Sequence, residues 1–195
     1  TTTVKIAEKP RVTRSPKVRT DLPIPKVGYL ERKVRLVPDL REVWSYVNPY
    51  MLYGRHMGYR GDFEKHLAAR EAKAVELFNE MEEVKREAAT FMKVRAVWQF
   101  FEAEAEGEAL HLFAAGGKEP VHTWKFRRQK IGDQLCLSDY VLPAREGQRD
   151  HVAVFVVTAG EGVRERAEKA KHDGYYFKSH GLQALAIETA EGCAE

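Results

Sequence analysis

Apolar residues recur at helical spacing in two stretches of the first ninety residues. In 39–47 (DLREVWSYV) they fall three or four positions apart, and Asn48-Pro49 ends the pattern, because a residue before proline avoids the helical region. In 62–88 a single apolar stripe follows Asp62, a good N-cap residue, so we predict one long helix. The aromatic, glycine-containing segment 50–61 (YMLYGRHMGYRG) between them is predicted as a loop or short helix.

The middle of the chain has the shorter alternation that is typical of strands. Three strand-like segments are separated by Gly107 and by Gly116-Gly117, which favours antiparallel hairpins; they are 92–101, 109–114 and 122–128. Residues 135–142 are predicted to continue the sheet or to lead into it. The uninterrupted apolar run 152–157 (VAVFVV) predicts a strand covered on both faces.

Helical patterns return at about 163–171 and from 175 to the end. Helices, then strands, then helices predict the α+β class. Residues 1–27 contain prolines among basic residues and are predicted to be an interdomain linker, whereas 28–195 form one domain.

Composition narrows the class of protein. Apolar residues make up 44% and charged residues 31% of the chain, as in a soluble globular domain. No apolar run approaches the ~18 residues of a membrane span, and the N-terminus does not resemble a secretory signal. Cys136 and Cys193 lie far apart, so we expect a reducing cytoplasm, no disulfide framework and no zinc site.

The net charge of +3 does not indicate nucleic-acid binding. Residues 1–20 carry a local net charge of +5, so the remaining residues sum to −2. Because the net positive charge is confined to the predicted linker, we expect no nucleic-acid partner and no membrane partner.

Motifs for catalysis are weak or missing. Gly160-Glu161-Gly162 lies between a strand and a helix, but Glu165 occupies the third position of a dinucleotide fingerprint, so a tight connection is favoured. The histidines lack metal-ligand spacing, and His56 lacks the aspartate of a cobalamin-ligating DxHxxG motif. We therefore predict no metal site and no catalytic nucleophile.

Two polar residues are candidates for ligand binding. Asn48 ends an apolar helix beside an aromatic loop, where its amide would hold an amino group or a ribose, or would only cap the chain. Glu191 lies near the apolar stripe of the last helix, where it would pair with a cationic ligand or face solvent.

Several segments together resemble the C-terminal reactivation domain of cobalamin-dependent methionine synthase. They are LCLSDYVLP, DHVAVFVVTAGEGV and KHDGYYFKSHGLQALAIETAEGCAE, supported by VNPYMLYGRHMGYRG and MKVRAVWQFFEAEAEGE. The resemblance covers most of 28–195. It implies a C-shaped domain with a twisted antiparallel sheet flanked by helices. It also implies that this domain binds S-adenosylmethionine for the reductive remethylation of inactive Co(II) cobalamin.

The resemblance also implies partners and residues. The cobalamin domain of the same enzyme and flavodoxin, or a similar one-electron donor, would be partners. Cobalamin, zinc and the methyl transfer from methyltetrahydrofolate to homocysteine would belong to other domains. Asn48 matches an acidic contact to the ligand's amino group, so Asn48→Asp is expected to tighten binding, and Glu191 matches a glutamate of the ligand site.

The family's Arg and Gly-Tyr-Pro motif and a later tyrosine would lie beyond Glu195, so we expect an incomplete domain that is inactive by itself. The alternative is a non-catalytic docking module that contacts the cobalamin domain and binds no ligand by itself.

Overall fold

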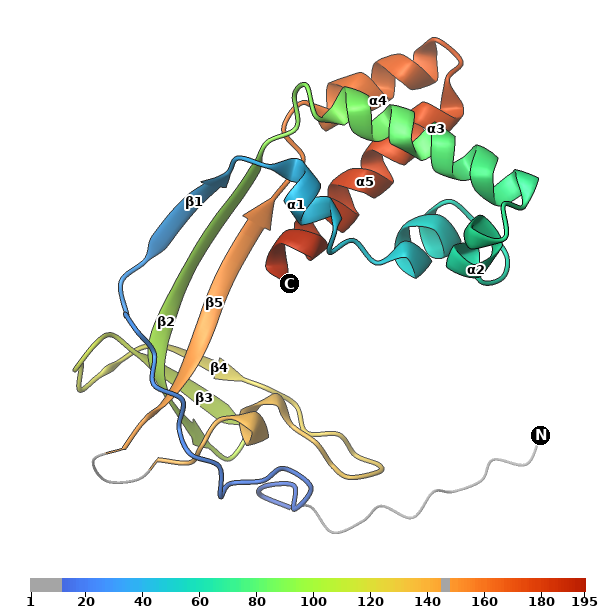
Figure 1. The fold of residues 1–195 in the computed structure, drawn as a ribbon. Coiled ribbons are helices and arrows are strands. Elements are labelled where there is room, and N and C mark those ends of the chain that lie inside the picture. The colour runs from blue at the N-terminus through green and yellow to red at the C-terminus, as the bar shows by residue number, and fades with distance from the viewer. Residues whose placement is uncertain (1–11, 145–147) are drawn as a thin grey trace. The chain divides into compact units, whose positions relative to one another are not determined.

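The computed structural model describes residues 12–144 and 148–195 (Figure 1). Within these ranges the elements, in chain order, are β1 (Lys33–Val37), α1 (Leu40–Trp44), η1 (Tyr50–His56, a π-helix), α2 (Phe63–Ala68), α3 (Ala72–Ala88), β2 (Val94–Glu106), β3 (Ala109–Phe113), β4 (Pro120–Lys125), η2 (Leu137–Tyr140, a 3₁₀ helix), β5 (Asp150–Thr158), α4 (Val163–His172) and α5 (Tyr176–Ala194).

The strands form one five-stranded sheet in the order β1-β2-β3-β4, with β5 paired to β2. The pairs β2–β3 and β3–β4 are antiparallel. This confirms the predicted α+β class. The chain divides into two compact units. The first consists of the described residues up to Lys33 together with Trp98–Val154, and the second of Val34–Val97 and Phe155–Glu195.

The first unit contains a buried ion pair beside its apolar core. Arg128 contacts both carboxylate oxygens of Asp139, at 2.5 and 2.7 Å. Asp139 also accepts hydrogen bonds from the backbone N–H groups of Cys136 and Ser15. Burial works to raise the pKa of Asp139, but the hydrogen bonds from Arg128, Cys136 and Ser15 hold it below its ordinary value.

Part of the predicted linker takes part in this cluster. Ser15 is buried, its hydroxyl donates to the Asp133 carbonyl, and the carbonyl of Thr13 accepts from Arg128. Residues 1–11 lie outside the described residues. The assignment of 1–27 as an interdomain linker stays a prediction.

In the second unit, α5 is the central helix. It contacts α1, η1, α3 and α4. Its buried residues are spread around much of its circumference, as expected for a helix covered on several sides; they are Ser179, Gly181, Leu182, Ala184, Leu185, Glu188, Thr189 and Gly192. Gly181 permits close packing against α3, because a Cβ there would lie 3.3 Å from the side chains of Met81 and Val84.

The prediction of one helix over 62–88 is wrong. The helix ends after Ala68, Arg70 adopts a left-handed conformation with φ of 57°, and α3 begins at Ala72. Tertiary contacts explain the break. Phe63 stacks on Tyr53 of η1 with ring centroids 3.8 Å apart, whereas α3 packs on α5. The apolar stripe continues through the break, so its spacing did not reveal that the two halves have different partners.

The prediction that the VAVFVV strand is covered on both faces is also wrong. Phe155 and Val156 on β5 are 56% and 59% exposed. The apolar run 152–157 therefore predicted the strand correctly, but it did not predict how much of the strand is exposed. The segment 135–142 folds around η2 and then leads into the sheet, where the N–H of Ala105 on β2 donates to the Leu142 carbonyl at 3.0 Å. The prediction missed β1, a short strand of which four of five residues are exposed.

Candidate functional site

Asn48 lies between α1 and η1 and caps the latter. Its side-chain oxygen Oδ1 accepts hydrogen bonds from the backbone N–H groups of Tyr50, at 3.0 Å, and Met51, at 3.4 Å. Only an acceptor can face two N–H donors, so these contacts fix the orientation of the amide. The amide nitrogen Nδ2 makes no hydrogen bond to any described residue, and the residue is exposed. Asn48 therefore presents a hydrogen-bond donor to its surroundings.

Glu191 lies near the end of α5 and is exposed. Its carboxylate forms no ion pair with a cation in the described ranges. Glu191 therefore presents an uncompensated negative charge, which suits a cationic ligand group.

Gly192 packs on the segment that leads into Asn48 and directly follows Glu191 in the sequence. A Cβ at Gly192 would lie 3.0 Å from the Val43 carbonyl oxygen and 3.4 Å from backbone atoms of Tyr46 and Val47. The last turns of α5 thus pack directly on the backbone that leads into Asn48, and Glu191 precedes the contact by one residue. We call residues 43–50 together with Glu191 and Gly192 the α1–α5 corner.

Two aromatic rings border Asn48. Tyr46 is 57% and Tyr50 is 58% exposed, and the guanidinium of Arg55 lies 5.5 Å from the centroid of the Tyr50 ring. Large rings at this exposure offer flat apolar surface for stacking. By contrast, burial, with a further contribution from Glu82, raises the pKa of Tyr53, which is buried against Phe63.

Two side-chain hydrogen bonds tie the segment from Trp44 to His56 to α5. The indole Nε1 of Trp44 donates to Thr189 Oγ1 at 2.9 Å. His56 Nε2 lies 2.8 Å from Glu188 Oε1, and the Glu188 side chain is 4% exposed. Glu188 is not among the candidates from the sequence, although it lies three residues after Leu185, on the buried side of the helix. A charged residue at that spacing was the available signal.

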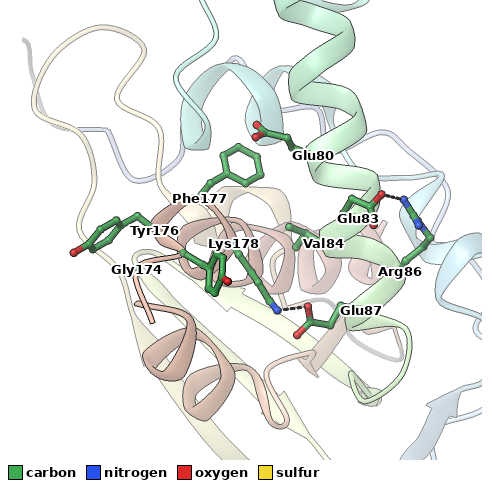
Figure 2. Close-up of a pocket in the computed structure, with 10 residues that line it drawn as sticks. Glu80, Glu83, Val84, Arg86, Glu87, Gly174, Tyr176, Phe177 and Lys178 are labelled. Carbon is green, nitrogen blue, oxygen red and sulfur yellow. Dashed lines mark hydrogen bonds and ion pairs between the residues drawn. The ribbon is translucent and has the colours of Figure 1, made fainter. Parts of the chain in front are cut away.

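A separate hollow of about 870 Å³ lies between α3 and the start of α5 (Figure 2). Its lining includes Tyr176, Phe177 and acidic residues of α3. Lys178 pairs with Glu87, and Arg86 pairs with Glu83, so these lining charges neutralise one another. The hollow is distant in sequence from Glu191 along the same helix and contains neither predicted site residue.

Other sequence candidates have structural roles. Gly162 has φ of 72° and stands at the N-cap of α4, which confirms the glycine pair as a strand-to-helix connection, and Glu161 pairs with Lys93 and Arg95. His172 and His180 fall on different helices. No group of three metal-binding side chains gathers within residues 12–144 and 148–195. Over the same ranges no helix has the length and apolar character needed to cross a membrane.

Comparison with known proteins gives two findings. A profile of the family described as "Vitamin B12 dependent methionine synthase, activation domain" matches residues 39–195. A solved structure described as "Crystal Structure of the MetH Reactivation Domain bound to AdoHcy" matches with a TM-score of 0.80 at 18% identity, covering 90% of this chain and 56% of that one. At this identity the structural match shows the fold, and the present chain spans little more than half of that solved chain.

Proposed function

The chain belongs to the family of vitamin B12-dependent methionine synthase activation domains, and from this membership we propose that it binds S-adenosylmethionine at the α1–α5 corner. The observation that carries the proposal is the close packing of Gly192, the residue after Glu191, on the backbone that leads into Asn48. Among the described residues, the Glu191 carboxylate has no ion-pair partner and the Asn48 amide nitrogen has no hydrogen-bond acceptor. A related solved domain is described as bound to AdoHcy, which shares the amino-acid and adenosine groups of S-adenosylmethionine.

The two side chains complement an amino-acid group. The ammonium of the ligand would donate to Glu191, in a charge-assisted hydrogen bond. The ligand's carboxylate would accept from Nδ2 of Asn48, because Oδ1 is already engaged by Tyr50 and Met51. The exposed rings of Tyr46 and Tyr50 would supply apolar surface for the adenosine.

The wider role follows from the family. S-adenosylmethionine carries an electrophilic methyl group, and the residues of this chain would hold that group toward a cobalamin-bearing domain of the same enzyme. Their contribution would be orientation, since a positioned reactant avoids much of the entropic cost of a bimolecular encounter. The reduction of inactive Co(II) cobalamin would draw on flavodoxin or a similar one-electron donor. The transfer of the methyl of methyltetrahydrofolate to homocysteine, and the zinc site, would belong to other domains.

Calorimetric titration of S-adenosylmethionine into the full chain tests this proposal. We expect saturable binding that Glu191→Gln weakens about tenfold or more, the loss of one charged hydrogen bond. Glu195→Gln is the matched control, since it removes another exposed glutamate one turn further along and should leave the affinity unchanged. Absence of saturable heat at millimolar ligand would instead favour a docking module that binds no ligand by itself.

A further inference from the structure

Glu188 is a buried carboxylate in the middle of the central helix. The residue is 3% exposed, and its carboxylate lies 2.8 Å from Nε2 of His56. A carboxylate removed from water is costly unless it is paired. Such a pair need not stabilise the fold, because apolar residues of similar volume often stabilise it equally well. Stability alone therefore does not account for the position of Glu188.

His56 is held by α5 at a second point. Nε2 of His180 lies 2.7 Å from the backbone carbonyl oxygen of His56, so that ring donates to the carbonyl. His180 and Glu188 are both on α5, eight residues apart, or about two helical turns. Contacts to both the side chain and the backbone of His56 fix the C-terminal end of η1 on α5.

The other side of Asn48 is held in the same way. Trp44 donates to Thr189 Oγ1, and the Thr189 hydroxyl in turn donates to the Leu185 carbonyl. The segment from Trp44 to His56 is therefore fastened at its two ends to Glu188 and Thr189, adjacent residues of one helix. Asn48 lies inside this loop, at the start of a π-helix, an uncommon form that is frequent at functional sites.

We infer that Glu188 and Thr189 are positioning residues which hold the segment that contains Asn48 on α5, the helix that carries Glu191. They touch no ligand themselves; they act by closing the 44–56 segment onto the helix that carries Glu191. The inference rests on the proposed function for its effect on ligand binding, whereas the fastening of the loop can be measured without ligand.

Amide hydrogen exchange and calorimetry on the full chain test this inference together. In Glu188→Ala we expect the amides of residues 50–56 to exchange about tenfold faster without ligand, and S-adenosylmethionine to bind about tenfold more weakly or worse. Glu188→Gln keeps an acceptor for His56 and should restore most of both quantities. Gln183→Ala, exposed on the same helix but two turns before Glu191, is the control and should change neither.

Thr189→Val provides a variant of nearly the same size should Glu188→Ala fail to fold. It removes the acceptor of Trp44, and we expect faster exchange at residues 44–50 together with weaker binding. Unchanged exchange at residues 44–56 in both folded variants would overturn the inference. If the wild-type chain bound no S-adenosylmethionine, the proposed function would fail, while exchange alone would still decide whether Glu188 and Thr189 hold the loop.

Discussion

At the scale of single residues, the hydrogen bonds of the Asn48 side chain decide which group of a ligand it can contact. The sequence pattern placed an amide where the family has an acid and so indicated a contact to the ligand's ammonium. In the structure the amide oxygen serves η1, which leaves a donor facing outward. The donor suits a carboxylate, and Glu191 is then the group that suits the ammonium.

Asn48→Asp separates these two interpretations. Aspartate still caps η1, but it removes the donor and places a negative charge beside the ligand's carboxylate. We expect the affinity for S-adenosylmethionine to fall about tenfold, or by about 1.4 kcal/mol, in a calorimetric titration. Tighter binding would show that this position contacts the ammonium, as the sequence alone suggested.

Arg70 offers a test of local backbone strain. A non-glycine residue with φ of 57° is disfavoured by the contact of its Cβ with the backbone. Arg70→Gly should raise the free energy of unfolding by about 0.5–1 kcal/mol, measured by urea denaturation. Arg70→Ala, which keeps a Cβ, is the control and should not reproduce the gain.

At the scale of elements, α5 organises the second unit, and Gly192 sets how closely α1 approaches it. A Cβ at this position would meet backbone atoms, which cannot rotate away as a side chain can. Gly192→Ala should therefore lower the free energy of unfolding by about 1–3 kcal/mol, as overpacking does. It should also weaken S-adenosylmethionine binding, because α1 must shift.

Cys193→Ala is a suitable comparison for Gly192→Ala, since it changes the next residue without adding a group. Denaturation and calorimetry measured on both variants would locate the effect. Equal affinity in Gly192→Ala and the wild type would contradict the assignment of the α1–α5 corner as the binding site.

Helices and strands with a strong hydrophobic periodicity were predictable from the sequence. Helix breaks and side-chain partners that depend on tertiary packing were not. The last helix and the hairpin strands follow from spacing and glycine turns, and they are confirmed. The break at Arg70 has no glycine or proline to announce it, because packing on two different partners causes it. Asn48 and Glu191 were candidates by their positions on predicted helices, and the family resemblance then matched them to ligand contacts. The partner of His56 required the fold, since Glu188 lies 132 residues away.

At the scale of the whole molecule, the two units contain different buried polar interactions. In the second unit, side chains of α5 form hydrogen bonds to Trp44 and His56. In the first unit, Arg128 and Asp139 form an ion pair, and the backbone of Ser15 donates to Asp139. The pKa of Asp139 lies below its ordinary value of 3.8, so the unfolded chain binds its proton more readily than the folded chain does. This pair therefore stabilises the fold above that ordinary value, and the contribution is lost as the pH falls through the lower folded-state pKa.

Asp139→Asn tests this linkage. Near pH 7 the variant should lose about 3–5 kcal/mol of unfolding free energy, because Arg128 is left buried without a counter-charge. As the pH falls below about 4, the wild type should lose stability more steeply than the variant, by up to about 1.4 kcal/mol per pH unit. Parallel pH profiles from urea denaturation would contradict the role given to Asp139. Asp133→Asn, an acidic neighbour whose side chain is not in the pair, is the control.

We propose that the α1–α5 corner holds the amino-acid end of S-adenosylmethionine, and a crystal structure of the full chain grown with S-adenosylmethionine would show this contact. We predict that the ligand's ammonium lies within hydrogen-bond distance of the Glu191 carboxylate, at about 2.7–2.9 Å, and that its carboxylate faces Nδ2 of Asn48. A ligand bound in the hollow beside Tyr176, or one whose amino-acid end avoids Glu191, would contradict the claim.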